Sequence, residues 1–188
     1  HFPNMAAQTI PITGTSSGIG REMAYHFARE KNNVFLTYNK GKSEGEKTMK
    51  ECLALGAPKV ELYNLDLTKD KEIRSLAQKI SSIDWLINNA GVFVYKSLDK
   101  QDHSDIENQL RTNLEGTIKM THAFLPHVKK GVVNIASAAG KEVYKHMSPY
   151  CASKFGLRGF TQAAALDFPM LKWYCVNPGY TATRMTNY

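Results

Sequence analysis

Short apolar runs that alternate with longer helix-like stretches most constrain what this chain can fold into. The apolar runs predict strands at Thr9–Thr13, Asn33–Thr37, Val60–Asn64, Trp85–Asn88, Val132–Ala136 and Trp173–Asn177. The stretches between them predict helices at Gly18–Glu30, Ser43–Leu55, Lys69–Ser81, His103–Val128 and Ser148–Asp167. Strands that are apolar along nearly their whole length are typical of a sheet covered on both faces. The alternation therefore predicts an α/β fold, a doubly wound parallel sheet with helices on both faces and a ligand crevice at the carboxyl ends of its strands.

Composition narrows the class of protein. The 188 residues suit a single domain, which we expect to span 1–188, with residues 1–8 as an N-terminal extension or the remnant of a tag. The three cysteines are widely spaced, which indicates reduced thiols and a cytoplasmic protein. No cysteine and histidine cluster has the spacing of metal ligands, so we expect no metal. No apolar run has the length of a membrane span, and we expect no membrane partner.

The net charge of +7 raises the question of nucleic-acid binding. The lysines are spread along the chain, however, and no run of five or more basic residues occurs. Solvated helix faces are the simpler interpretation, so we expect no nucleic-acid partner. A basic surface would also favour an anionic cofactor.

A glycine-rich turn, Thr13–Gly20, follows the first predicted strand and opens the first predicted helix. Gly14 allows a sharp exit from the strand, while Gly18 and Gly20 permit close backbone approach and tight packing of the helix. Free N–H groups at a helix N-terminus attract phosphate. The alternative is a flexible turn without a ligand. The residues expected to contact a pyrophosphate are Gly14, Ser16, Ser17, Gly18, Ile19 and Gly20.

A tyrosine and a lysine four residues apart, Tyr150 and Lys154, share one face of a predicted helix. A nearby cation lowers the pKa of a phenol, which can then exchange a proton with a carbonyl or alcohol oxygen. Tyr38 and Lys42 have the same spacing but fall in a predicted loop, where the spacing is interpreted as accidental. Ser137 ends a predicted strand at the expected crevice and could hold a substrate oxygen.

Several further motifs follow in order along the chain. They are Asp66 in Leu65–Thr68, Asn88–Gly91, Asn113 in Thr112–Leu114, Ser137, Tyr150, Lys154, Pro178-Gly179 and Thr183. With the turn at Thr13–Gly20, this ordered set resembles the short-chain dehydrogenase/reductase family, in its compact single-domain branch, over nearly the whole chain. The resemblance implies a Rossmann-like domain that binds NAD(P). The further cofactor contacts that it implies are Asp66, Leu67, Asn89, Ala90, Gly91, Tyr150, Lys154, Pro178, Gly179 and Thr183.

The resemblance also implies roles in catalysis. Tyr150 would be the general acid and base, and Lys154 would bind the nicotinamide ribose and lower the pKa of Tyr150. Ser137 would orient the substrate oxygen, and Asn113 would hold a water of the proton relay and brace its helix. Two alternatives stay open, because Asn113 could be purely structural and Asp66 could cap the helix that follows it.

The segment that ends the second predicted strand bears on the choice of cofactor. An acid there would bind the ribose hydroxyls of NAD, whereas basic or neutral groups favour NADP. Tyr38 and Asn39 are followed by Lys40 and Lys42, and no acid precedes Glu44. The lysines could meet a 2′-phosphate, or they could be solvated loop residues. We therefore expect NADP(H), with NAD(H) as the alternative cofactor.

The sequence ends at Tyr188, soon after Pro178-Gly179, whereas members of the family usually continue through a further helical segment and a last strand. We therefore expect the C-terminal segment of the family pattern to be missing from this sequence. The expected function is hydride transfer between NADP(H) and a small-molecule carbonyl or alcohol, in a homodimer or homotetramer. The alternative is a dinucleotide-binding regulator or scaffold of the same fold without turnover. The residues expected to line the substrate pocket are Phe93, Val94, Ala138, Ala139, Tyr144, Met147 and Tyr180.

Overall fold

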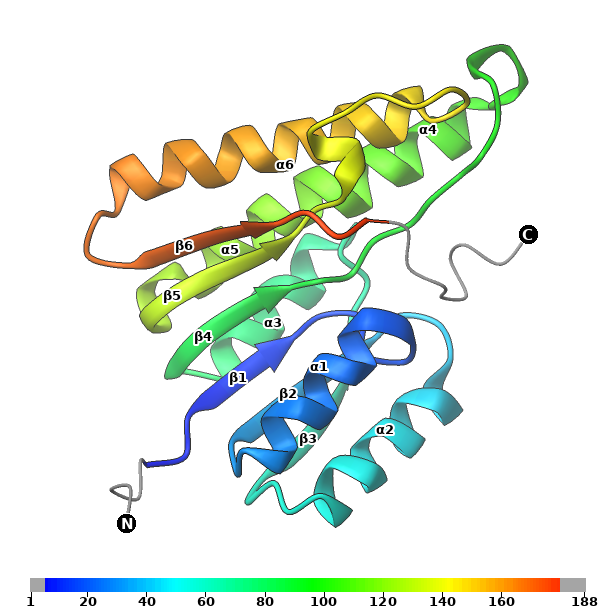
Figure 1. Cartoon of the computed structure of the whole chain (residues 1–188). Coiled ribbons are helices and arrows are strands. Elements are labelled where there is room, and N and C mark those ends of the chain that lie inside the picture. The colour runs from blue at the N-terminus through cyan, green and yellow to red at the C-terminus, as the bar shows by residue number, and fades with distance from the viewer. Residues whose placement is uncertain (1–5, 180–188) are drawn as a thin grey trace.

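The computed structural model describes residues 6–179 and contains one six-stranded parallel sheet in the order β3-β2-β1-β4-β5-β6 (Figure 1). The strands are β1 (Thr9–Ile12), β2 (Asn33–Tyr38), β3 (Val60–Asn64), β4 (Ile83–Asn88), β5 (Val128–Ile135) and β6 (Lys172–Val176). Every neighbouring pair is parallel, as the sequence predicts. Residues 1–5 of the expected N-terminal extension, the expected pocket residue Tyr180 and the expected cofactor contact Thr183 lie outside the described part of the chain.

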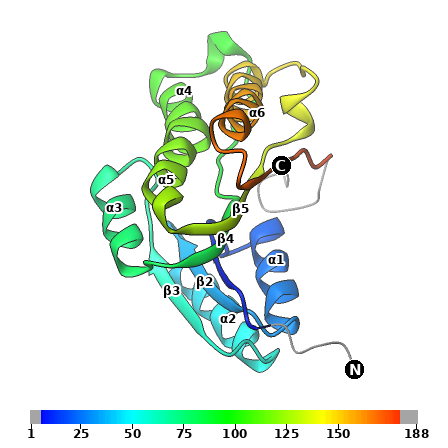
Figure 2. The same cartoon turned by 90° about the vertical axis from the view of Figure 1, so that its left-hand side faces the viewer.

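Helices cover both faces of the sheet. They are α1 (Gly18–Arg29), α2 (Lys42–Ala54), α3 (Asp70–Lys79), α4 (His103–Leu110), α5 (Thr117–Phe124) and α6 (Ser148–Asp167). Figure 2 shows α1 and α2 on one side of the sheet and α3, α5 and α6 on the other. Within residues 6–179, none of the helices combines the length and apolar character that crossing a membrane requires.

Alternate residues of the strands supply two separate cores. Val34 and Leu36 are fully buried and pack with the residues of α1 and α2, whereas Phe35 between them packs with α3 and α5. Successive side chains of a strand point to opposite faces, so an all-apolar strand needs helices on both sides. The predicted doubly wound sheet is therefore confirmed.

The predicted helix His103–Val128 is interrupted in the structure. A π-helical turn (Arg111–Gly116) separates α4 from α5, and a 3₁₀ turn (Leu125–His127) ends the helical stretch. A β-carbon on Gly116 would lie 2.6 Å from the carbonyl oxygen of Leu67, so this turn passes close to the loop after β3. β5 also begins four residues earlier than predicted, because the exposed Lys129 and Lys130 conceal the apolar pattern of its start.

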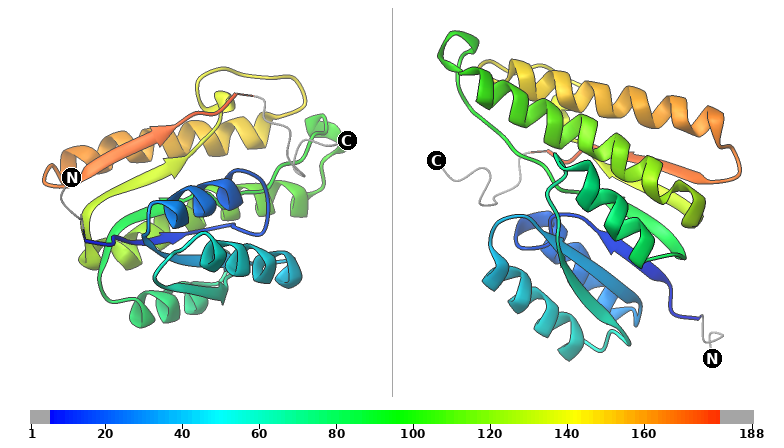
Figure 3. Two further views of the ribbon diagram at one scale, coloured as in Figure 1. Left: turned by 60° about the horizontal axis from the view of Figure 1, so that its bottom comes forward. Right: turned by 180° about the vertical axis from the view of Figure 1, so that it is seen from behind.

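The chain reverses its direction of winding between β1 and β4, as Figure 3 shows from two further sides. The registered backbone pair between these two strands is Ile12 with Ile87, whereas β2 and β3 register five pairs. Side chains supplement the ladder here, since the Thr9 N–H donates to the Asp84 carboxylate at 2.8 Å. In open parallel sheets, ligands bind in the crevice beside such a reversal point.

Candidate active site

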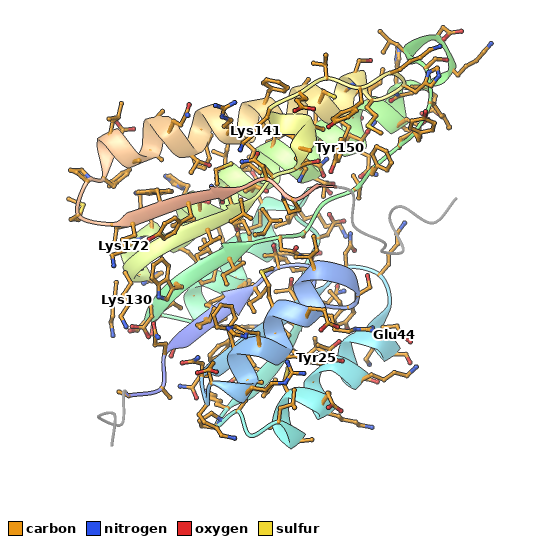
Figure 4. The ribbon with its side chains drawn as sticks, viewed as in Figure 1. Tyr25, Glu44, Lys130, Lys141, Tyr150 and Lys172 are labelled. Atoms are coloured by element: carbon orange, nitrogen blue, oxygen red, sulfur yellow. The ribbon has the colours of Figure 1, made fainter. Side chains whose placement is uncertain are left out.

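A cavity of about 690 Å³ lies where the predicted site residues converge. Figure 4 shows Tyr150 and Glu44 toward the carboxyl ends of the strands, and Lys130 and Lys172 at the opposite end of the sheet. Most of the predicted residues line this cavity: Gly14, Ser16, Ser17, Gly18, Ile19, Asn39, Lys40, Leu67, Asn89, Ala90, Gly91, Ser137, Tyr150, Lys154, Pro178 and Gly179.

Four described residues of the predicted site do not line the cavity. Gly20 packs beneath the glycine-rich turn, and Tyr38 pairs with Asn64 at the end of β2. Asn113 is 1% exposed and lies behind the cavity wall. The Asp66 carboxylate accepts hydrogen bonds from the Thr68 N–H at 2.9 Å and its hydroxyl at 2.7 Å, a turn that precedes α3. Leu65 and Leu67 on either side of Asp66 do reach the cavity.

The glycine-rich turn has the backbone that its sequence requires. Gly14 and Gly18 have φ angles of 72° and 57°, in the left-handed region that favours glycine. A β-carbon on Gly14 would lie 2.8 Å from the Ala90 Cα, and one on Gly20 would overlap the Gly14 carbonyl. The first-turn N–H groups of α1 have no partner within the helix by geometry, and its N-cap residue Ser17 makes no side-chain cap bond. Gly18 and Ile19 of this first turn line the cavity, which is the arrangement expected of a turn that binds an anion.

Buried threonines hold this turn in place. The Thr37 hydroxyl accepts from the Gly14 N–H at 3.2 Å, and the Thr37 carbonyl accepts from the Thr15 N–H at 2.9 Å and from its hydroxyl at 3.1 Å. The Thr48 hydroxyl of α2 donates to the Thr15 carbonyl at 3.0 Å. The Thr13 hydroxyl accepts hydrogen bonds from the backbone N–H groups of Asn89 and Ala90. The turn is thus bonded to β2, to α2 and to the loop after β4.

The predicted catalytic side chains come together on the other side of the cavity. Tyr150 and Ser137 line the same cavity, and Ser137 lies near enough to the phenol to lower its pKa. The Lys154 ammonium lies 5.6 Å from the centre of the Tyr150 ring and donates to the Ile135 carbonyl at 3.2 Å. A β-carbon on Gly91 would lie 3.5 Å from the same ammonium nitrogen, so a side chain there would fill the space beside it.

Burial dominates the acid–base properties of this pair. Burial raises the pKa of Tyr150 above its ordinary value, and the nearby Ser137 side chain acts in the opposite direction. Burial lowers the pKa of Lys154 from 10.5 to about 8. The lowered Tyr150 pKa expected from the sequence is therefore not found in the protein alone. Burial of the phenol outweighs the nearby cation, because the Lys154 ammonium lies over the ring and donates a hydrogen bond to the Ile135 carbonyl.

Asn113 uses its whole amide group within the protein. Its Oδ1 accepts from the Val92 N–H at 2.7 Å, and its Nδ2 donates to the Val92 carbonyl at 2.8 Å and to the Ser153 hydroxyl at 3.2 Å. The side chain therefore fixes the loop after β4 against α6 at Ser153, which lies three residues after Tyr150 and one before Lys154. This is the bracing part of the role that the sequence predicted.

Apolar side chains surround Tyr150. The Phe93 ring meets the Tyr150 ring edge to face at 4.8 Å between centroids, and Ala139, Cys151 and Met147 complete the cluster. Of the predicted pocket residues, Phe93, Ala138, Ala139, Tyr144 and Met147 line the cavity and Val94 does not. Lining residues that the sequence analysis missed are Thr37, Leu65, Val92, Tyr95, Asn108, Thr112, Ile135 and Ala136. Several of them directly follow or end a strand, which is the signal that would have found them.

No group of three or more histidine, cysteine, aspartate or glutamate side chains in residues 6–179 is arranged to hold a metal ion.

Comparison with known proteins identifies the family of the chain. Residues 8–188 match the family model of the short chain dehydrogenases, and the chain belongs to that family. Estradiol 17-beta-dehydrogenase 11 from Macaca fascicularis is 34% identical over 193 residues, which cover 96% of this chain and 64% of the relative. The chain thus spans less than two thirds of the length of that relative.

Solved structures share the fold. A short chain dehydrogenase from Burkholderia cenocepacia in complex with NADP is 30% identical, with a TM-score of 0.89 over 95% of this chain and 76% of that one. A dehydrogenase/reductase from Sinorhizobium meliloti is 25% identical, with a TM-score of 0.91 over 96% of this chain and 75% of that one. The family predicted from the sequence is confirmed.

Proposed function

We propose that this protein is an NADP(H)-dependent oxidoreductase that interconverts a carbonyl and an alcohol. The observation that carries the proposal is the position of the Tyr150 phenol, which shares one cavity with Ser137, with Lys154 and with the glycine-rich turn, and whose ring centre lies 5.6 Å from the Lys154 ammonium. The turn fits a dinucleotide, because Gly14, Ser16, Ser17, Gly18 and Ile19 line the cavity at the N-terminus of α1, where backbone N–H groups favour a pyrophosphate. A bound nicotinamide would supply or accept the hydride.

The chain itself handles the proton. In reduction, the Tyr150 hydroxyl gives its proton to the substrate oxygen, and in oxidation the phenolate takes one from the alcohol. The raised pKa of Tyr150 keeps the phenol protonated at neutral pH, which favours reduction. The Ser137 hydroxyl orients the same oxygen, and the Lys154 ammonium would hold the ribose hydroxyls of the cofactor.

The preference for NADP(H) is supported by charge at the end of β2. Lys40 and Asn39 line the cavity there, and no acidic side chain does. Glu44, the first acid after β2, is engaged by Arg21 at 2.8 Å and Lys47 at 2.9 Å. The solved relative from Burkholderia cenocepacia holds NADP. A 2′-phosphate would thus meet positive and neutral groups.

The substrate class that fits best is a lipophilic secondary alcohol or ketone, such as a hydroxysteroid. The wall beside Tyr150 consists of Phe93, Ala139, Met147 and neighbouring apolar groups. Burial of an apolar substrate against such a wall is favourable, and the Tyr150 and Ser137 hydroxyls can bind the reacting oxygen. The name of the relative from Macaca fascicularis points to the same class.

We also propose that the protein is a homodimer or homotetramer. The side chains of Phe155 and Leu166, eleven positions apart on α6, are 39% and 83% exposed. Spacings of eleven residues return to the same face of an α-helix, so both belong to one outward stripe. Burial of that stripe against a second copy would remove it from water.

Titration with NADPH and, separately, NADH, followed by nucleotide fluorescence, tests the cofactor. We expect tighter binding of NADPH, and a screen of ketones and hydroxysteroids then tests turnover. Tight binding without any turnover would favour the regulator or scaffold of the same fold. Failure to bind either dinucleotide would refute the proposed function.

A further inference from the structure

Arg21 in α1 connects three parts of the cofactor turn. Its Nη2 donates both to the Ser16 carbonyl and to the Glu44 carboxylate, the latter at 2.8 Å. Its Nε donates to the Thr48 hydroxyl at 3.2 Å. The guanidinium is half-buried, with 26% of the side chain exposed. One planar cation therefore fixes the glycine-rich turn to the first turns of α2.

Glu44 is held from two sides. Lys47 meets its Oε1 at 2.9 Å while Arg21 meets Oε2. These hydrogen bonds, first that of Lys47 and then that of Arg21, lower the pKa of Glu44 to about 2. The carboxylate is therefore ionised at any pH at which the protein would work, and its charge is compensated by two cations.

The carboxylate lies beside the cavity without lining it. Because one nitrogen of Arg21 bonds both Ser16 and Glu44, a single guanidinium group separates the carboxylate from the turn. Gly41 shows the same proximity, since a β-carbon there would lie 3.8 Å from the Ser16 Cβ and 4.0 Å from the Glu44 Cβ. Ser16 itself lines the cavity, as does Lys40.

We propose that Arg21 decides the choice between NADPH and NADH by holding and neutralising Glu44. With Arg21 in place, the region between the end of β2 and the start of α2 contains Lys40 and a carboxylate whose charge is compensated. Such a region does not repel a 2′-phosphate. Without Arg21, Glu44 keeps only Lys47, and its charge repels a 2′-phosphate while its oxygens can accept the hydroxyls of an unphosphorylated ribose. Arg21 is thus a positioning residue that acts through Glu44, and the inference rests on the proposed dinucleotide site.

The other charged groups nearby do not replace Arg21. Lys42 is directed to Glu46 at 3.8 Å and is mostly exposed. Lys40 lines the cavity and would supply the positive charge that meets a 2′-phosphate. A freed carboxylate beside this corner of the cavity would repel the 2′-phosphate, and we expect roughly a tenfold loss of affinity for NADPH.

The test compares dissociation constants of NADPH and NADH by nucleotide fluorescence, and of 2′,5′-ADP and 5′-AMP by calorimetry, in four proteins. They are the unmodified protein, Arg21→Ala, Glu44→Gln and the double variant. We expect Arg21→Ala to lower the preference for the 2′-phosphate about tenfold. The double variant should recover it, because the charge that Arg21 compensates is gone.

Recovery separates this inference from a bracing role, since loss of the Ser16 and Thr48 bonds would persist in the double variant. Arg21→Lys provides a second check, because it retains the positive charge and should keep most of the preference. An unchanged preference in Arg21→Ala, or no recovery in the double variant, would overturn the inference. In either case the unmodified protein still binds dinucleotide, whereas failure of the proposed function would appear as no binding in any of the four.

Discussion

The two sides of the cavity differ in the kind of contact that holds them, hydrogen-bonded backbone on one side and apolar side chains on the other. Around the glycine-rich turn, backbone groups are held by the buried hydroxyls of Thr13, Thr15 and Thr37. Around Tyr150, the contacts are mainly apolar, with the Phe93 ring at 4.8 Å. One side therefore presents main-chain donors in a fixed geometry. The other side presents the polar side chains of Ser137, Tyr150 and Lys154 among mainly apolar contacts.

This difference suits different tasks. A pyrophosphate carries the same shape in every dinucleotide, so a rigid backbone cradle can bind it without adjustment. Proton transfer needs a group whose pKa is set by its surroundings, and burial sets it here for both Tyr150 and Lys154. Substitutions on one side should thus impair cofactor binding, and substitutions on the other should impair proton transfer, each without affecting the other function.

The largest effect should come from Tyr150→Phe. The substitution retains the ring and its contact with Phe93 but removes the hydroxyl that moves the proton, so turnover should fall about 1000-fold. Binding of NADPH should change little, because the glycine-rich turn is untouched. Steady-state kinetics together with fluorescence titration measures both. Equal losses of binding and turnover would show that the two sides are not separable.

A pH-dependent effect on stability should come next, at Lys154. Its folded-state pKa of about 8 lies below the ordinary 10.5, so between these values the unfolded chain binds more protons than the folded one. The free energy of unfolding should therefore rise with pH across this window, by about 3 kcal/mol relative to Lys154→Met. Urea unfolding of both proteins at pH 7.5 and pH 10.5 measures the difference. A parallel pH dependence in the two proteins would contradict a shifted Lys154 pKa.

Asn113→Ala should destabilise the protein by about 2 kcal/mol, because it leaves the N–H and carbonyl of Val92 without their partner in a buried place. Chemical denaturation measures the loss. Ser153→Ala is the matched control, since it leaves both Val92 bonds in place and removes the 3.2 Å bond to the Asn113 amide together with the 2.7 Å bond from the Ser153 hydroxyl to the Tyr150 carbonyl. If both variants lose equally, the Val92 bonds do not carry the effect.

The smallest effect should come from Thr37→Val on the turn side. The change keeps the shape but deprives the Gly14 N–H of its acceptor, at a cost of about 1 kcal/mol. We expect NADPH binding to weaken severalfold while the pH profile of turnover stays the same. Thr37→Ser keeps the hydroxyl and should bind like the unmodified protein. A changed pH profile would mean that the turn also influences Tyr150.

The same contrast explains how much could be predicted from the sequence. The turn side depends on neighbours in the chain, and Gly14 and Gly18 have the positive φ angles that their positions implied. The strands and their parallel arrangement followed from apolar runs such as Val132–Ile135, whose pattern is local. Such features are set by conformational preferences that a short segment already expresses.

The catalytic side depends on contacts between distant segments. The bond between Asn113 and Val92 joins a π-helical turn to a loop, and neither was visible as a pattern. The pKa of Tyr150 was expected to fall, because the spacing to Lys154 was known but the burial of both was not. Tertiary packing decides such quantities, and a single sequence contains no direct record of it.

The junction of β1 and β4 has a mechanical consequence. The registered pair of Ile12 with Ile87 and the bond from the Thr13 N–H to the Ile87 carbonyl are supplemented by side chains, since Asp84 accepts from the Thr9 N–H and Asn89 donates to the Thr13 carbonyl. The sheet can therefore be regarded as two halves joined by backbone and side-chain bonds at this junction. A ligand that contacts both halves would connect them further, so occupancy of the cavity and rigidity of the sheet should rise together.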